Sequence, residues 1–342
     1  MVFINIVSWN GMKYLPDALK SIFNQTYKDF SVLVIDNGST DGTVDFLRAE
    51  YPQVSILKNS KNLGFAGPHN QGIKFVFNLC EKNNLDLEKN YMLITNPDIV
   101  LTPNFLEKII LRADNHSDGA SFGGKILKIF NDDMVSCPTE TIDSVGLKVF
   151  KNRRIAERGS GEGDAGQYNG EEEIFGFSDM LVLYRLSVFK NTEIKNGYFD
   201  SKYLNYKEDI DLAWRLRIFG WKSFYIGSAV AYHFRGVYES EKRNLKVIIR
   251  ERKAKKGMIN YYATSNHLFT ILKNDFLVNF LKDSPRIFFY ELSKFFYILF
   301  FEIKSLGAYL YFVKNFFKVW ETRKEVMSRI KIDSGEIRKW FY

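Results

Sequence analysis

The first half of the chain alternates short apolar runs with segments of helical periodicity. Four mainly apolar runs predict strands: residues 2–7, which are rich in β-branched residues, residues 32–35, which should be buried, and residues 54–57 and 91–94. Three segments carry apolar residues at helical spacing: residues 14–23, 44–49 and 67–80. Strands that alternate with helices require a mostly parallel sheet, so we expect an α/β, Rossmann-like fold.

Polar turns follow two of the predicted strands. Asp36 ends the second strand, and Asn96-Pro97-Asp98 follows the fourth. Ligands of parallel sheets bind outside the carboxyl ends of the strands, so both aspartates are candidates for a binding site. The Asp36 carboxylate can accept N–H donors from a nucleobase, and Asp98 can hold a hard divalent cation. Both turns are also ordinary turn sequences, which leaves a purely structural role open.

A loop rich in glycine precedes the third predicted helix. It spans residues 62–72, and the free N–H groups of the helix that follows could face a phosphate. A glycine-rich loop alone does not identify a phosphate site.

A second cluster of acidic residues lies in the second half of the chain. Glu208, Asp209 and Asp211 begin a segment of helical periodicity. They either complement the helix dipole or lie over a cleft. His233 follows two predicted strands, residues 223–226 and 229–232, which should return the chain to the same cleft.

The other histidines have no companion residues at the spacing of metal ligands. We therefore expect His69, His116 and His267 to be packed or solvated side chains.

In their order and spacing, these motifs resemble the family-2 glycosyltransferases of the GT-A fold. The likeness is to the rhamnosyltransferase-like members that act on polyprenyl-linked or cell-wall acceptors, and it covers roughly residues 2–235. Five segments carry it: residues 35–42, 62–66, 95–98, 208–212 and 232–233. The resemblance implies that Asp36 binds the nucleobase, that Asp98 and His233 hold Mg²⁺ or Mn²⁺, and that Asp209 is the catalytic base beside Glu208.

Other residues complete the predicted site. Donor binding is also expected of residues in the first turn, the glycine-rich loop and the helix after it, and the proline turn: Ser8, Trp9, Asn62, Gly64, Asn70 and Asn96. Asn96 departs from the family pattern, in which the metal motif has two aspartates, so only Asp98 can supply charge. Asp179 is an additional carboxylate and, with Asp211, a candidate for acceptor binding. Asp179 could equally cap a local turn.

The expected reaction is inverting and metal-dependent. It moves a sugar, with rhamnose as one candidate, from a nucleoside-diphosphate sugar to a hydroxyl of a lipid-linked or polysaccharide acceptor. One carboxylate suffices as the base, and no Ser-His-Asp or Cys-His arrangement suggests a covalent nucleophile. One alternative is a sugar-phosphate nucleotidyltransferase, but the first turn lacks a basic glycine-rich signature. The other is a catalytically weakened nucleotide-sugar or glycan-binding protein, which Asn96 favours.

Composition bounds the organisation of the chain. The 342 residues are 46% hydrophobic, which excludes a disordered protein. Cys80 and Cys137 have no framework spacing, and the N-terminus enters a strand without a secretory signal, so we expect a cytoplasmic location. The expected division is a catalytic domain over residues 1–240 and a helical region over residues 241–342. Residues 151–173 are predicted to be a mobile loop over the active site or a solvated insert.

The predicted C-terminal region is basic and aromatic. It holds 21 Lys and Arg against 10 Asp and Glu, whereas residues 1–240 hold 27 against 30. Charged residues interrupt every apolar stretch, so no helix is expected to span a membrane. The composition favours helices bound to anionic lipid at the inner face of the plasma membrane. A helical lid and a homodimer interface together have similar weight, and no motif indicates nucleic-acid binding.

Overall fold

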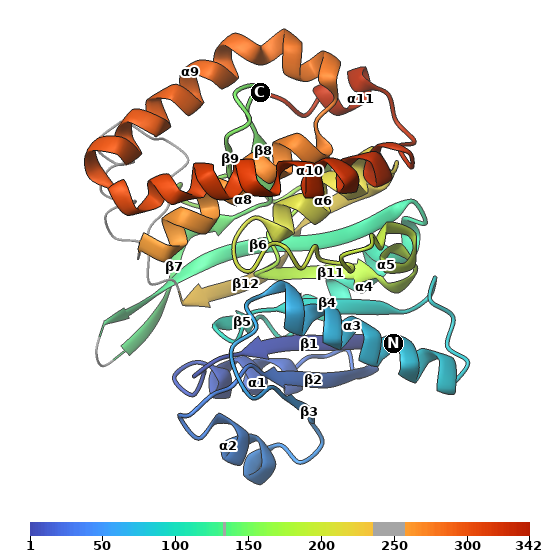
Figure 1. The fold of residues 1–342 in the computed structure, drawn as a ribbon. Coiled ribbons are helices and arrows are strands. Elements are labelled where there is room, and N and C mark those ends of the chain that lie inside the picture. Colours follow the sequence, from blue (N-terminus) through green and yellow to red (C-terminus); the bar gives the residue numbers. More distant parts are fainter. Residues whose placement is uncertain (133–134, 235–256) are drawn as a thin grey trace.

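The structure is a computed structural model that describes residues 1–132, 135–234 and 257–342 (Figure 1). Its core is a mixed sheet with these strands: β1 (Val2–Ser8), β2 (Phe30–Asp36), β3 (Ser55–Lys58), β4 (Tyr91–Thr95), β5 (Ile99–Leu101), β6 (Gly119–Asp132), β7 (Val135–Ser144), β10 (Glu171–Ile174), β11 (Leu181–Arg185) and β12 (Lys222–Phe234). The order is β10-β12-β6-β11-β4-β1-β2-β3, with β5 paired to β12 and β7 to β6. A separate ribbon pairs β8 (Leu147–Val149) with β9 (Ile155–Glu157).

The four strands predicted from the apolar runs form the parallel half of this sheet. Strand β1 pairs in parallel with β2 and β4, and β2 pairs in parallel with β3. Ser8 lies opposite Asp36, and Ile6 lies opposite Thr95, so the carboxyl ends of β1, β2 and β4 meet at one edge. Strand β11 runs antiparallel to β4 and places Leu181 opposite Thr95 at that same edge.

Helices cover both faces of the sheet. They are α1 (Leu15–Phe23), α2 (Thr43–Glu50), α3 (Ala66–Lys82), α4 (Phe105–Asn115), α5 (Leu186–Thr192) and α6 (Glu208–Ile218). Successive residues of a strand point to opposite faces. Accordingly Ile4 of β1 packs in one apolar cluster with Leu19 of α1, and Phe3 packs in another with Ile73 of α3 and Leu212 of α6. The α/β prediction is thereby confirmed.

The two strands predicted before His233 are one strand. Strand β12 is continuous from Lys222 to Phe234, with a shift in its register against β6 between Ile226 and Val230. A β-bulge absorbs the extra residues there without ending the strand, and such bulges re-aim the side chains that follow. Separating the predicted strands at residues 227–228 was therefore wrong.

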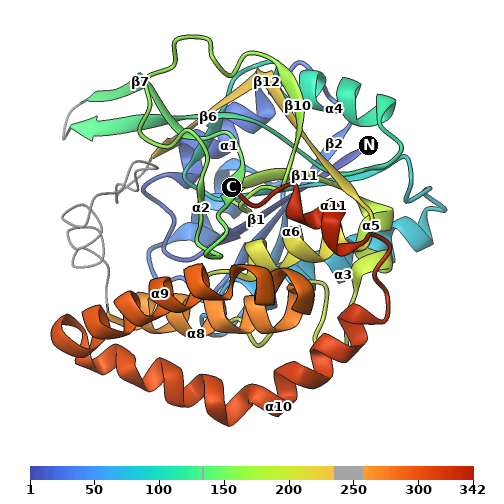
Figure 2. The same ribbon diagram turned by 90° about the horizontal axis from the view of Figure 1, so that it is seen from above.

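The C-terminal region is helical, as predicted. It comprises α8 (Gly257–Asn274), α9 (Leu277–Phe301), the short helix η1 (Ile303–Leu306), α10 (Gly307–Met327) and α11 (Ser334–Arg338). Helix α8 lies between α6 and the outer helices α9 and α10 (Figures 1 and 2). The last residues return to the sheet domain, where the Tyr342 N–H donates to the Val149 carbonyl at 2.9 Å. A division at residue 240 stays a prediction, although contacts cross it extensively.

Residues 151–173, predicted to be a mobile loop or a solvated insert, include β9 and the start of β10, and the Arg153 side chain before β9 is fully buried. Its guanidinium donates to Asp275 at 2.7 Å and to Asp283 at 2.9 Å, which ties the β8–β9 ribbon to the C-terminal helices.

Candidate active site

The donor side of the site begins where β1 and β2 end. Ser8 and Asp36 are adjacent in the sheet, and both side chains are fully buried. The Ser39 N–H donates to the Asp36 carboxylate at 3.2 Å, which closes a tight turn over it. Trp9 follows Ser8 and is 58% exposed, so its indole is available to a ligand. The predicted Ser8, Trp9 and Asp36 are thus brought together.

The glycine-rich loop is held by Asn37, which the sequence analysis missed. Its side-chain amide donates to the Asn62 side chain at 3.1 Å and to the Gly64 carbonyl at 2.9 Å. Gly64 has a φ of +78°, and a Cβ there would lie 2.0 Å from the Leu204 carbonyl oxygen. Only glycine fits this position. The donor-side loop is therefore in direct contact with the segment that leads into α6.

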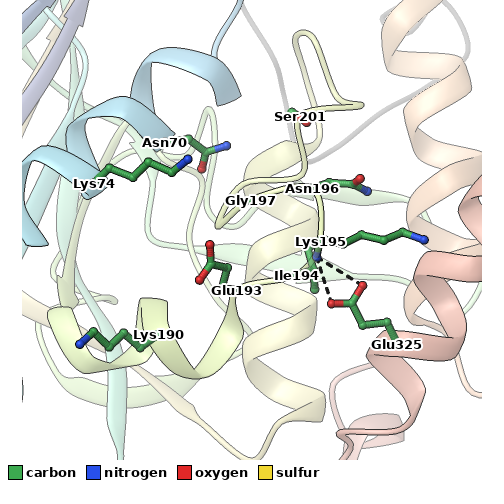
Figure 3. Close-up of a pocket in the computed structure, with 10 residues that line it drawn as sticks. All are labelled: Asn70, Lys74, Lys190, Glu193, Ile194, Lys195, Asn196, Gly197, Ser201 and Glu325. Atoms are coloured by element: carbon green, nitrogen blue, oxygen red, sulfur yellow. Dashed lines mark hydrogen bonds between the residues drawn. The ribbon is translucent and has the colours of Figure 1, made fainter.

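Asn70 lies apart from this edge. Its side chain donates to the Phe199 carbonyl at 2.8 Å and accepts the Phe199 N–H at 2.9 Å. It lines a cavity of about 700 Å³ with the surface residues Lys74 and Lys190 (Figure 3). No other predicted site residue is among the described residues that line this cavity. The donor-binding role of Asn70 stays a prediction.

The predicted metal ligands are neighbours. The Phe234 N–H donates to the Asp98 carbonyl at 3.0 Å, which joins the end of β12 to the turn after β4. This contact places the His233 Nε2 atom 3.4 Å from Asp98 Oδ2. The other ring nitrogen, Nδ1, lies 2.8 Å from Asp143 Oδ2 on β7. A carboxylate on the second ring nitrogen orients the imidazole of many metal sites, and nothing in the sequence marked Asp143 for this role.

Asp98 and His233 fit an incomplete metal site. Among the residues that the structure describes, no three His, Cys, Asp or Glu side chains form a ready-made set of ligands. The Asp98 Oδ1 atom is buried and has no hydrogen-bond partner, so it can accept a cation. Mg²⁺ in particular is often held by one or two carboxylates while waters and substrate phosphates supply the remaining ligands. Asn96, on the same turn, adds no charge.

His233 should make stability depend on pH in the absence of metal. Burial lowers the pKa of His233, but hydrogen bonds to Asp143 and Asp98 outweigh it and raise the pKa to about 9. Histidine in an unfolded chain has a pKa of about 6.5. The stabilisation is therefore complete below about pH 6.5 and is lost as pH rises through about 9. In EDTA, we expect the difference in the free energy of unfolding between the wild type and His233→Asn to fall by about 3 kcal/mol across this pH range. Urea unfolding at the two ends of the pH range measures this difference. A difference that does not change with pH would contradict the prediction.

The acidic side of the site is built at the start of α6. Tyr206 and Lys207 both have positive φ, 70° and 75°, which turns the chain sharply before Glu208. Asp179 lies just before β11, and the Asn96 N–H donates to the neighbouring Met180 carbonyl at 3.0 Å. The segment that carries Asp179 is therefore bonded to the turn that carries Asp98.

Asp179, Glu208 and Asp209 influence one another electrostatically. Burial and the charge of Asp209 raise the pKa of Asp179 and of Glu208 well above their usual values. Burial also raises the pKa of Asp209, while the Ile210 N–H, 2.7 Å away, stabilises its charged form. The pKa values of Glu208 and Asp179 are raised furthest, so these two groups keep their protons more readily than Asp209 does. The role of Asp209 as a base stays a prediction.

Unpaired oxygens mark both sides of the site. Within the described part of the chain, four buried side-chain oxygens of predicted site residues have no hydrogen-bond partner: Ser8 Oγ, Asp98 Oδ1, Asp179 Oδ2 and Glu208 Oε2. Other buried atoms share this condition, but few native groups remain unpaired without a reason. Polar groups of a bound substrate would satisfy these four.

Asp211 points to the interior. Its carboxylate accepts hydrogen bonds from Arg215 at 3.0 Å and Asn274 at 2.7 Å, and Lys273 Nζ lies 2.8 Å away. Both oxygens are used in this conformation. Acceptor binding by Asp211 stays a prediction.

Helix α8 holds the segment before Glu208 and Asp209. Asn266 donates to the carbonyls of Asn205 and Tyr206 at 3.0 and 2.8 Å, and Lys273 contacts Asp200 at 2.6 Å. Thr270 meets the Tyr203 hydroxyl at 3.0 Å. The sequence analysis missed this role. The available signal was a polar stripe at helical spacing, because Asn266, Thr270 and Lys273 share one face of a helix.

The remaining histidines are packed, as predicted. Burial lowers the pKa of His69 to about 3, and its ring lies 2.8 Å from the Asn5 side chain. His267 is buried 3.0 Å from Glu291. His116 stacks on Phe224 with ring centroids 3.9 Å apart.

Comparison with known sequences finds a matching family profile and a curated relative. The sequence profile described as "Glycosyl transferase family 2" matches residues 3–191, from β1 into α5. It ends before Glu208, Asp209 and His233. A curated N-acetylglucosaminyl-diphospho-decaprenol L-rhamnosyltransferase from Mycobacterium tuberculosis is 25% identical over 244 residues, which cover 66% of this chain and 74% of the relative.

Solved structures share the fold. GalNAc-T7, solved with UDP, GalNAc and Mn²⁺, superposes with a TM-score of 0.58 at 11% identity. The match covers 80% of this chain and 48% of that one, so this chain spans about half the length of GalNAc-T7. Residues 1–349 of S. aureus TarS superpose with a TM-score of 0.53 at 15% identity, covering 96% and 83%. These neighbours confirm the GT-A-like fold class with C-terminal helices.

Proposed function

Since the chain belongs to glycosyltransferase family 2, we propose that it transfers a sugar from a nucleoside-diphosphate sugar to a hydroxyl of a polyprenyl-linked or glycan acceptor, with inversion. One observation carries this proposal. The Asp98–His233 pair lies on a turn that is bonded to the segment carrying Asp179, and Asp98, Asp179 and Glu208 each have a buried oxygen without a hydrogen-bond partner.

Each side of the site has a separate task in the proposed reaction. Asp36, Trp9 and the loop around Gly64 hold the nucleotide, while Asp98 and His233 hold Mg²⁺ or Mn²⁺. When bound there, a divalent cation would supply positive charge to offset the charge on the leaving diphosphate. Asp209 removes the proton of the acceptor hydroxyl as the hydroxyl oxygen attacks the anomeric carbon on the face opposite the diphosphate, and the bond between that carbon and the diphosphate oxygen breaks.

The protonated acids position the acceptor. A protonated carboxyl group donates a hydrogen bond, which an ionised one cannot do. Glu208 and Asp179, whose raised pKa values favour the protonated form, can therefore donate to acceptor oxygens. The Tyr184 hydroxyl donates to Asp179 at 2.5 Å and fixes its orientation.

Rhamnose and a polyprenyl-linked acceptor are the finer part of the proposal. They are supported by the mycobacterial rhamnosyltransferase, which is similar over two thirds of this chain. A thermal-shift screen over nucleoside-diphosphate sugars, with and without Mn²⁺, tests the donor, because a ligand of the folded state raises the melting temperature. Turnover of the best ligand then separates an enzyme from a weakened binding protein. Binding of the donor without release of nucleoside diphosphate, in the presence of metal and acceptor, would favour the binding protein.

The metal assignment predicts a difference between two conditions. Replacing Asp98 or His233 by alanine removes one of two protein ligands, so donor affinity in Mn²⁺ should fall at least about tenfold. In EDTA the same variants should bind the donor nearly as the wild type does. Isothermal titration of each variant measures both affinities. The matched control is His116→Ala, because His116 stacks on Phe224 and contacts neither Asp98 nor His233. Equal losses in Mn²⁺ and EDTA would show that Asp98 and His233 stabilise the fold and do not bind metal.

A further inference from the structure

Helix α9 buries Ile287 and Ile298 together with polar residues, and it exposes much of its apolar surface. Its polar residues Asn279 and Asp283 are buried, and Glu291 is largely so, each with a partner inside the protein. Its opposite face is apolar and exposed: Leu281 59%, Phe288 60%, Phe289 65%, Phe296 47% and Phe300 72%. A soluble helix normally turns such a face toward the core, so this face is built for an apolar environment outside the chain.

Helix α10 adds a second exposed stripe. Leu310, Val313, Phe317 and Trp320 recur at helical spacing and are 66%, 67%, 80% and 39% exposed. Its buried face, which includes Val319, packs toward α8. Helix α9 lies along the upper margin of the molecule in Figure 1, and α10 lies along the lower margin, outside α8, in Figure 2. We call the exposed residues of α9, η1 and α10 the outer cap surface.

The charge of this surface is positive. Residues 277–320 contain six Lys and Arg against three Asp and Glu. Of the three acids, Asp283 is fully buried and Glu291 is mostly so. Lys314 and Lys318 are exposed beside Phe317 on α10, and Lys282 and Arg286 are exposed on α9. Basic side chains thus flank an aromatic surface.

No described helix is both long and apolar enough to cross a bilayer. Among the described residues nothing covers the apolar face, so a partner is needed to bury it. A second copy of this chain, related by a twofold axis, would pair this basic patch with itself. An anionic lipid surface instead complements them and accepts aromatic side chains at the depth of its headgroups.

We propose that the outer cap surface docks on an anionic lipid bilayer, with the aromatic residues of α9 and α10 inserted between the headgroups. The docking stands on these two helices alone. Docking would bring a lipid-linked acceptor to the side of α8 that carries the outer cap surface. This consequence for the reaction rests on the proposed function.

Co-sedimentation of the full chain with vesicles tests the docking. Vesicles of phosphatidylglycerol and phosphatidylcholine should bind the protein at low salt, and binding should weaken as salt rises. Vesicles of phosphatidylcholine alone should bind at least about tenfold less. The double variant Phe300→Glu/Phe317→Glu should lose at least about tenfold in binding to the anionic vesicles. Leu111→Glu, at a leucine on α4 that is 59% exposed, is the matched control and should bind as the wild type does.

Each other outcome has a definite meaning. Wild-type protein that stays in the supernatant with anionic vesicles at low salt overturns the docking. So does equal loss of binding in the cap variant and in Leu111→Glu. A dimer in sedimentation velocity that the cap variant abolishes, without vesicle binding, assigns the surface to a second copy. Donor titration keeps the two proposals apart. Vesicle binding without donor binding contradicts the proposed function alone, and donor binding without vesicle binding contradicts the docking alone.

Discussion

Replacement of Asp209 by asparagine should lower kcat at least about a hundredfold while donor affinity stays nearly unchanged. A general base acts on the proton of the acceptor hydroxyl, which forms no part of the donor, so its loss appears in turnover. The structure adds a reason for choosing Asp209 over its neighbours. It is the group whose charged form receives the Ile210 N–H, whereas burial and the charge of Asp209 favour the protonated form of Glu208.

Glu208→Gln is the matched control for this experiment. Glutamine is neutral and donates hydrogen bonds, as a protonated glutamate does, so this variant should lose much less turnover. Release of nucleoside diphosphate in the presence of acceptor measures kcat, and isothermal titration measures donor affinity. Near-normal turnover in Asp209→Asn would remove Asp209 from the mechanism and direct attention to Glu208 or Asp211.

Replacement of Lys273 by methionine should produce the largest loss of stability. The Lys273 ammonium is buried between Asp200 and Asp211, at 2.6 and 2.8 Å. Methionine keeps much of the volume but leaves two buried carboxylates with one fewer cation. Removing one partner from a buried ion pair costs about 3–5 kcal/mol. Because the same contacts hold the segment before Glu208, kcat should fall as well. Urea unfolding measures the loss of stability.

An exposed lysine provides the control for Lys273. Lys324 pairs with Glu321 on the surface of α10, and Lys324→Met should leave stability almost unchanged. Acid provides a second test. Burial raises the pKa of Asp200, but Lys273 outweighs it and lowers the pKa. The stabilisation is thus present above the unfolded pKa of aspartate and is lost as pH falls through the folded one. The difference between wild type and Lys273→Met should shrink in acid, and a pH-independent difference would contradict the ion-pair explanation.

The parallel half of the sheet was predictable because its strands are mainly apolar runs. The run from Val32 to Ile35, for instance, is entirely apolar, which predicts a buried strand, and all four side chains are buried. The strands beyond β4 carry mixed signals. Strand β6 begins with Gly119 and contains Gly123 and Gly124, where a Cβ would meet Phe177 and the Ala229 backbone. Close packing against neighbours far away in sequence selected those glycines, and local periodicity does not record it.

The site was predictable where single residues end strands, and unpredictable where charges pair across the fold. Asp36 and Asp98 follow apolar runs, so the topology of a parallel sheet alone placed them at one edge. Asp143 reaches His233 across 90 residues, and no local pattern connects them. Lys273 belongs to the basic region that we expected to bind anionic lipid, yet its side chain is buried. Pairing decides whether a charge can be buried, and pairing is a property of the assembled structure.

The burial of Arg153 also bears on how the chain reaches this structure. The ion pair of Arg153 with Asp283 joins residues 130 positions apart, and neither charge can leave water until β8, β9 and α9 are all in place. Closing a loop of this length costs conformational entropy, and contacts between residues close in sequence do not offset that cost beforehand. Desolvation of this pair therefore belongs late on the folding pathway, after the sheet has formed. Until then we expect the buried faces of the C-terminal helices to add to the apolar surface that is already exposed, which favours aggregation.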